Sequence, residues 1–167
     1  MKIIFLDFDG VVVCLPLVDG KKPITGGRVR DANRGPVAQL NRIIDATGAK
    51  VVVSSTWRKH HPIPHLLGTL ARAGFRGEIV SITPDFAFRD KQESGIWQPT
   101  PRGEEIRHWL AMHPAVTSYV VLDDCFDNGP IPPERWVNVD NGWFDGGLLE
   151  HHADAAIKVL NGTAQEK

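Results

Sequence analysis

The sequence has few of the features that mark secreted or membrane proteins. It contains only two cysteines, Cys14 and Cys125, which cannot make a disulfide framework, and we interpret both as reduced thiols in a cytosolic setting. Only Lys2 separates Met1 from the first apolar run, which is too short for a signal peptide, and no apolar run is long enough to span a bilayer. We therefore expect a cytoplasmic protein without a membrane partner.

The sequence also lacks an excess of either charge. Its 19 lysines and arginines and 20 aspartates and glutamates give a formal net charge of −1. Binding to a polyanion such as nucleic acid would therefore need a local basic patch. The length of 167 residues and the 42% hydrophobic content allow one domain with a substantial core. Because no repeat or linker divides the sequence, we expect residues 1–167 to form a single domain.

Short apolar runs rich in β-branched residues alternate with stretches of helical periodicity. This alternation predicts an α/β fold in which a five-stranded parallel sheet lies between helices. Thr100 and Pro101 predict the start of a helix, as a hydroxyl cap followed by proline at the first helical position. Asn161 and Gly162 predict the end of the last helix. The candidate strands are Lys2–Leu6, Lys50–Ser54, Glu78–Ile82, Ser118–Leu122 and Trp136–Val139.

Two irregular stretches, 13–36 and 83–101, interrupt this alternation. Each follows the end of a predicted strand. Ligands of open α/β sheets bind beyond the carboxyl ends of the strands, so we expect both stretches to border the functional site.

The first strand runs into Asp7 and Asp9, followed by Gly10. The spacing sends both carboxylates from the tip of the strand toward one side, and Gly10 releases the backbone into a turn. One such carboxylate can act as a nucleophile and the other as a proton donor, both around a divalent cation. Alone, the pattern is also typical of a strand-end turn in which aspartates cap N–H groups.

The strand predicted at 118–122 runs into Asp123 and Asp124, with Asp127 as a weaker further candidate. Carboxylates that cluster without a cation disfavour joint ionisation. Mg²⁺ is a hard cation that takes oxygen ligands, so it would resolve this repulsion.

The strand predicted at 50–54 ends in hydroxyl residues, namely Ser54, Ser55 and Thr56. Hydroxyls and backbone N–H groups at a strand end suit an anion because they donate without adding bulk. Arg58 can hold a phosphate with a forked pair of hydrogen bonds, although it can equally be a surface arginine.

These segments resemble the haloacid dehalogenase (HAD) superfamily, whose members mostly hydrolyse phosphate esters through an aspartyl-phosphate. The run Asp-Phe-Asp-Gly-Val at 7–11 resembles the signature of that superfamily, and Ser-Ser-Thr-Trp-Arg at 54–58 and Leu-Asp-Asp at 122–124 extend the resemblance. It implies a HAD-like Rossmannoid fold with a minimal cap, because either insert is too short for more than a flap. In this superfamily, such an open site is typical of members that act on large substrates.

The resemblance also implies roles for individual residues. Asp7 is the expected nucleophile and Asp9 the acid and base. The expected Mg²⁺ ligands are Asp7, the backbone carbonyl of Asp9, and Asp123 or Asp124.

The remaining roles concern the phosphoryl oxygens and a fixed cation. Ser55 is the first choice to hold the phosphoryl oxygens, with Ser54 and Thr56 as near alternatives. Arg58 is the candidate for a substrate phosphate. The cation that balances the nucleophile is expected at Arg102, in the first turn of the predicted helix, with Lys91 as the alternative.

The form Ser-Ser-Thr-Trp-Arg is similar to small capless HAD domains grouped with nucleic-acid repair, such as the phosphatase half of polynucleotide kinase–phosphatase. We therefore expect a Mg²⁺-dependent phosphomonoesterase that acts on DNA or RNA ends or on nucleotides. The alternatives are a small-metabolite phosphatase and a non-catalytic HAD-fold binding module.

Aromatic and histidine residues in and after the segment Ser-Ser-Thr-Trp-Arg leave two interpretations open. We interpret Trp57 as a packing residue and the histidines as solvated loop residues. The alternatives are that Trp57 stacks on a base and that the histidines form a basic lip for a phosphodiester backbone. The histidines are His60, His61 and His65.

Overall fold

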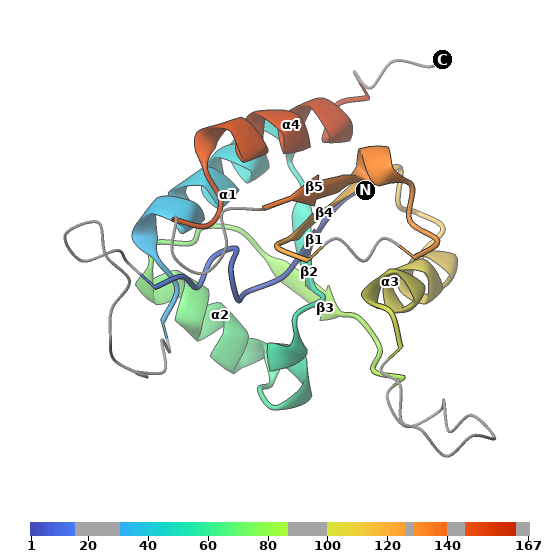
Figure 1. Cartoon of the computed structure of the whole chain (residues 1–167), viewed down its shortest axis with the longest axis horizontal. Helices are drawn as coiled ribbons and strands as arrows, with labels where there is room; N and C mark the ends of the chain where they lie inside the picture. Colours follow the sequence, from blue (N-terminus) through green and yellow to red (C-terminus); the bar gives the residue numbers. More distant parts are fainter. Residues whose placement is uncertain (16–30, 87–99, 126–128, 140–145, 163–167) are drawn as a thin grey trace.

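The computed structural model describes residues 1–15, 31–86, 100–125, 129–139 and 146–162 of the chain. These residues form a five-stranded sheet with the order β3-β2-β1-β4-β5, in which every neighbouring pair is parallel (Figure 1). The predicted five-stranded parallel sheet is confirmed. The strands are β1 Lys2–Leu6, β2 Lys50–Val53, β3 Ile79–Ile82, β4 Ser118–Asp123 and β5 Trp136–Asn138.

Four α-helices of the described chain cover the two faces of the sheet. The helices α1, α2 and α4 pack on one face, against side chains such as Ile4 and Leu6 of β1. The helix α3 packs on the other face, where Trp109 contacts the ring of Phe5 with centroids 5.4 Å apart. Because both faces are covered, the strands are apolar runs rather than alternating ones. The helices are α1 Arg34–Thr47, α2 Ile63–Arg72, α3 Arg102–Ala111 and α4 Glu150–Leu160.

The helix ends match the sequence only in part. The helix α4 ends with Asn161 as its C-cap residue, as predicted. The helix α3 begins at Arg102, and Pro101 is its N-cap residue. The prediction that proline occupies the first helical position was therefore wrong by one residue.

The interpretation of His65 as a loop residue was wrong, because it lies within α2. Pro62 is the N-cap residue of this helix and Pro64 follows in its first turn. A proline lacks an N–H group, but the first N–H groups of a helix have no partner within it, so prolines are tolerated there. Here they begin a helix rather than interrupt one.

The strand β1 is central, with β2 on one side and β4 on the other. The register pairs Leu6 with both Val53 and Leu122. The next residues along the three strands therefore meet at one edge of the sheet, where they are Asp7, Ser54 and Asp123. The strands run from β1 through β2 to β3 on one side and through β4 to β5 on the other, so this edge is the topological switch point, where open α/β sheets bind their ligands. Among the described helices, none has the length and apolar character needed to cross a membrane.

Candidate active site

Asp7 lies just beyond β1, with its side chain almost completely buried. Its backbone N–H donates a hydrogen bond to the carbonyl oxygen of Leu122 at 3.0 Å, which continues the pairing with β4. The Oδ1 atom of Asp7 accepts the backbone N–H of Phe8 at 2.7 Å. The carboxylate is therefore held in one place at the edge of the sheet.

A tight turn follows this first aspartate. The carbonyl oxygen of Phe8 accepts hydrogen bonds from the N–H groups of residues 11–13, at distances from 2.8 to 3.2 Å. Gly10 has a φ of 74°, in the region that favours glycine. A Cβ atom at Gly10 would lie 2.2 Å from Oδ2 of Asp124. The glycine therefore allows both the turn and the close approach of the Asp124 carboxylate.

Arg102 joins the carboxylates that follow two neighbouring strands. Its Nη1 atom donates to Oδ2 of Asp7 at 2.6 Å, and it also contacts Oδ2 of Asp123. Burial lowers the pKa of the guanidinium, but Asp7 and Asp123 together raise it by more, so the net shift of the pKa is upward. The side chain therefore stays charged and offsets both carboxylates. Lys91, the alternative cation, lies outside the described residues.

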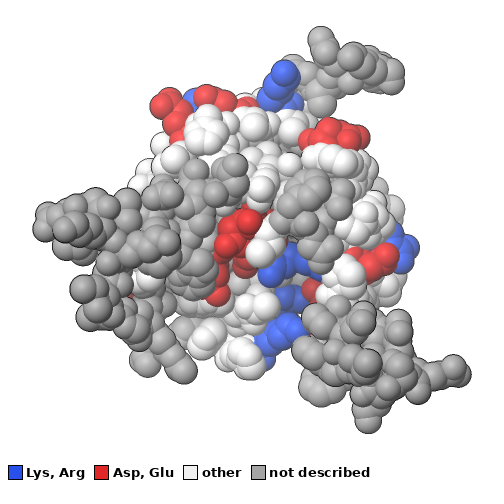
Figure 2. All heavy atoms as spheres, in the orientation of Figure 1, with Lys and Arg blue, Asp and Glu red and all other residues white. Residues whose placement is uncertain are grey.

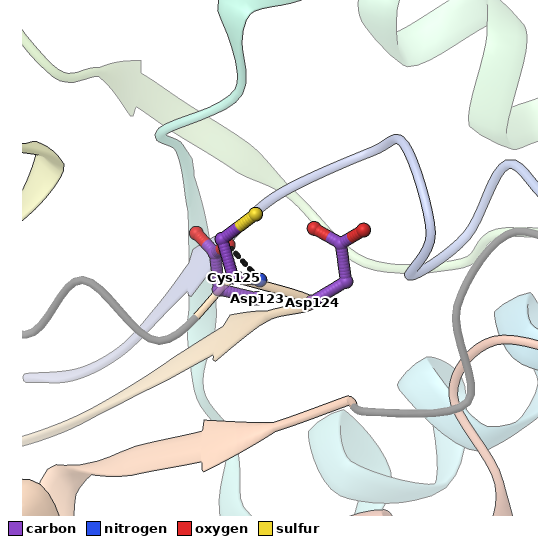
Figure 3. Close-up of side chains that lie close together, drawn as sticks. All are labelled: Asp123, Asp124 and Cys125. Carbon is purple, nitrogen blue, oxygen red and sulfur yellow. Dashed lines mark hydrogen bonds between the residues drawn. The ribbon is translucent and has the colours of Figure 1, made fainter.

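The strand β4 ends in a group of three ligand-bearing side chains (Figure 3). Asp123 is fully buried, and its Oδ1 atom accepts the backbone N–H of Cys125 at 2.9 Å. Asp124 is half-buried, and its carboxylate lies beside that of Asp123 (Figure 3). Ligand atoms of Asp123, Asp124 and Cys125 lie within 4.8 Å of one another. Asp127 lies outside the described residues.

The carboxylates of this cluster have an unfavourable environment for their charged forms. Burial is the main cause that raises the pKa of Asp123 and of Asp124, and the charge of Asp7 adds to both shifts. Burial also raises the pKa of Asp9, although the hydrogen bond from Trp57 opposes this. A bound cation would relieve the repulsion, because it interacts favourably with every carboxylate.

The donor set suits a hard divalent cation such as Mg²⁺. The carboxylates of Asp7 and Asp124 offer oxygen atoms. Among the described residues, no backbone N–H donates to the carbonyl oxygen of Asp9, so this oxygen is available too. Both oxygens of Asp123 already accept hydrogen bonds from Arg102 and Cys125. Asp7 is hydrogen-bonded in the same way, by Phe8 and Arg102, so these contacts alone do not exclude Asp123. Asp124 has no ion pair with Arg102 among the described residues and is less buried than Asp123, so Asp124 is the ligand that we expect from β4.

The hydroxyl residues after β2 differ in their surroundings. Ser54 and Ser55 are both fully buried, whereas Thr56 is exposed. The Oγ atom of Ser55 accepts the backbone N–H of Trp57 at 3.3 Å, which caps the short helix η1 Thr56–Lys59. The Oγ atom of Ser54 is buried without a partner among the described residues. The unpartnered Ser54 hydroxyl is therefore as good a candidate for a phosphoryl oxygen as Ser55.

Arg58 does not fit the substrate-binding role that the sequence indicated, and that prediction is corrected here. Its guanidinium is buried, and all five N–H groups donate to the protein. Four of them donate to backbone carbonyl oxygens at 2.8 to 3.0 Å, and the fifth donates to the carboxylate of Glu105. No donor remains for a phosphate. Arg58 instead fixes the loop after β2.

A cavity of about 220 Å³ lies beside the carboxylates. Basic and acidic side chains meet at the centre of the face that Figure 2 shows. The basic side chains that line this cavity are Arg58, Lys59 and Arg102. The segments 16–30 and 87–99, which make up most of the two stretches expected to border the site, lie outside the described residues.

The sequence did not reveal the contacts of Glu105 and Trp57. Glu105 lies one helical turn after Arg102 in α3, so helical spacing could have placed both on the face toward the site. Trp57 was interpreted as a packing residue, and its ring does pack against Phe8 with centroids 5.3 Å apart. Its Nε1 atom also donates to Oδ2 of Asp9 at 3.0 Å, for which the sequence carried no signal.

The strand order and the charged groups at the carboxyl ends of β1 and β4 define a HAD-like α/β domain. The model of the HAD domain in Swiss Army Knife RNA repair proteins matches residues 3–153, which is most of the chain. The chain therefore belongs to this family, and the resemblance inferred from its motifs is confirmed. A search among curated proteins gave no match, and neither did a search among solved structures.

Proposed function

We propose that this protein is a Mg²⁺-dependent phosphomonoesterase that forms an aspartyl-phosphate on Asp7. The observation that carries the proposal is the contact of Arg102 with both Asp7 and Asp123. A carboxylate nucleophile that meets a phosphate needs fixed positive charge beside it, and Arg102 supplies this charge. Mg²⁺ bound by Asp7, Asp124 and the carbonyl oxygen of Asp9 would add further positive charge against the phosphoryl oxygens.

The first step transfers the phosphoryl group to the enzyme. A carboxylate oxygen of Asp7 forms a bond to phosphorus while the bond from phosphorus to the ester oxygen breaks. Asp9, in its acid form, donates its proton to that leaving oxygen. Burial raises the pKa of Asp9, which favours this protonated form.

The second step releases phosphate. Asp9, now a carboxylate, takes a proton from a water molecule, and the water oxygen forms a bond to phosphorus. The bond between phosphorus and Asp7 then breaks, which restores the Asp7 carboxylate and yields inorganic phosphate. The hydroxyl groups of Ser54 and Ser55 and the guanidinium of Arg102 are the donors toward the phosphoryl oxygens during both steps.

For the substrate we propose the phosphorylated end of a nucleic acid. The support is the family, because its description names RNA repair proteins. The match over residues 3–153 also supports a single HAD domain for the chain. The intact set of carboxylates and Arg102 argues against a non-catalytic module, since binding alone would not require it.

The test is Mg²⁺-dependent phosphate release from a 3′-phosphorylated oligonucleotide, with 5′-phosphorylated, mononucleotide and aryl phosphate substrates in parallel. We expect release by the wild type with Mg²⁺, and a fall on the order of 10⁴-fold or more in kcat for Asp7→Asn. Full activity of Asp7→Asn would remove Asp7 as the nucleophile. Cleavage of mononucleotides or aryl phosphate alone would keep the chemistry but discard nucleic-acid ends as the substrate.

A further inference from the structure

Trp57 makes a direct hydrogen bond to the proposed acid and base. The Nε1–H of its indole donates to Oδ2 of Asp9 at 3.0 Å. Among the described residues, no other side chain and no backbone N–H donates a hydrogen bond to this carboxylate. Arg102, in contrast, contacts Asp7 and Asp123. The orientation of the Asp9 side chain therefore depends on Trp57.

The indole is itself held firmly. Its ring packs against both Phe8 and His61, with centroid distances of 5.3 and 5.6 Å. His61 stacks in turn on His65, with centroids 4.3 Å apart and planes 13° apart. The backbone N–H of Trp57 donates to Oγ of Ser55. A side chain that is held by two ring contacts and at its backbone can keep its hydrogen-bond partner in one rotamer.

Chemistry limits what Trp57 can do. An indole N–H is a hydrogen-bond donor only and does not ionise near neutral pH, so Trp57 cannot replace Asp9 as the acid. Its bond to one oxygen of Asp9 leaves the other oxygen to carry the proton. General acid catalysis depends on such placement, because the proton must reach the leaving oxygen in the transition state.

We propose that Trp57 is a positioning residue that holds the Asp9 carboxyl group, through Oδ2, in the orientation needed to protonate the leaving oxygen. The proposal rests on the phosphatase function proposed above. It also assigns a role to the tryptophan of the segment Ser-Ser-Thr-Trp-Arg. The ring of Trp57 still packs against Phe8, but in this proposal its hydrogen bond to Asp9 is what contributes to catalysis.

The test compares two esters in the Trp57→Phe variant, which keeps an aromatic ring and loses the N–H. A phosphorylated oligonucleotide has an alcohol leaving group that needs a proton, whereas the leaving oxygen of p-nitrophenyl phosphate does not. We expect kcat for the oligonucleotide to fall by about 10² or more, with KM nearly unchanged and p-nitrophenyl phosphate affected only a few-fold. The ratio of the two rates does not depend on the folded fraction, because both substrates meet the same enzyme.

Trp109→Phe is the matched control. Trp109 donates through Nε1 to Oγ of Ser81 at 3.0 Å. It packs on the opposite face of the sheet from Phe8. The substitution therefore deletes the same atoms as Trp57→Phe, but at a site distant from Asp9. The rate ratio should stay at its wild-type value in this variant. An equal fall for both esters in Trp57→Phe, or no fall, would overturn the positioning role.

A second measurement tests whether the loss of kcat in Trp57→Phe depends on Asp9. In the background of Asp9→Asn, Trp57→Phe should cause no further loss with the oligonucleotide, because the two residues then act as one unit. Independent, additive losses would overturn the proposal while leaving the phosphatase function intact. Failure of the wild type to cleave any phosphate ester would overturn both proposals.

Discussion

Arg58 and Glu105 form a buried ion pair that joins the loop after β2 to the helix that carries Arg102. The two side chains are 3% and 6% exposed. Burial lowers the pKa of Arg58 and raises that of Glu105, and their mutual attraction offsets part of each shift. The pair therefore carries a desolvation cost that only the intact geometry compensates. Because Glu105 and Arg102 both lie in α3, the pair also fixes the position of Arg102 at the start of this helix.

Removal of Glu105 should destabilise the protein strongly. Glu105→Ala leaves the buried guanidinium of Arg58 without its carboxylate partner, and we expect a loss of about 3–5 kcal/mol in the free energy of unfolding. Urea denaturation followed by circular dichroism measures this loss. Asp45→Ala is the control, because Asp45 pairs with Arg76 at the surface, where the side chains are 60% and 65% exposed. It should cost less than about 1 kcal/mol. Similar losses in both variants would contradict the interpretation.

Gly10 should tolerate no side chain, for two separable reasons. Alanine at this position is strained at a φ of 74°, and its Cβ would collide with Asp124. Gly48 has a similar φ of 67° and nothing within 4 Å of such a Cβ. Both alanine variants should therefore lose about 1–2 kcal/mol of stability from backbone strain, but only Gly10→Ala should also lose phosphatase activity. Equal activity in the two variants would show that activity does not depend on the position of the Asp124 carboxylate against Gly10.

The sequence predicted the strands well because their signal is local. Each strand is a short run of apolar residues covered on both faces, so its place follows from the composition of that run alone. Every predicted strand is present, and its ends differ from the prediction by at most one residue. The positions of the carboxylates and of Arg102 were predictable for a related reason, since strand ends and the first turn of a helix can be located along the chain, whereas their roles were inferred from the resemblance to the HAD superfamily.

The contacts that depend on side-chain direction were not predictable. Arg58 was expected to face a substrate, yet it turns into the protein to reach Glu105, 47 residues further along the chain. Trp57 and Asp9 lie 48 residues apart in the sequence. Their spacing says nothing about which way each side chain points. Such pairs are set by the tertiary packing of segments that are far apart in the sequence, which no local pattern encodes.

Removal of the Arg102 charge should slow catalysis strongly. Arg102→Met keeps much of the apolar stem but removes the charge beside Asp7 and Asp123, and we expect kcat to fall by about 10²–10³. Arg107→Met is the control, because Arg107 lies in the same helix and pairs with the partly exposed Glu104. Its kcat should stay within about twofold of the wild-type value. Steady-state kinetics with one phosphorylated substrate measures both variants. A loss for Arg107→Met as large as that for Arg102→Met would indicate a general effect of charge on α3.

Mg²⁺ should stabilise the folded protein through Asp124. A ligand that binds only the folded state at 100 times its Kd adds about 2.7 kcal/mol to the free energy of unfolding. We therefore expect Mg²⁺ to raise the Tm of the wild type and to have much less effect on Asp124→Asn. Because this substitution also removes a repulsive charge, the comparison concerns the Mg²⁺-dependent change in Tm and not the Tm itself.

Cys125→Ser is the control for the Mg²⁺ experiment. Its thiol lies within the same cluster of ligand atoms as Asp123 and Asp124, but sulfur is a poor ligand for a hard cation. The Mg²⁺-dependent change in Tm should therefore match that of the wild type. Differential scanning fluorimetry across a Mg²⁺ titration, after treatment with a chelator, gives both comparisons. A wild-type response retained in Asp124→Asn would show that this carboxylate is not a ligand, and would move the expected ligand from β4 to Asp123.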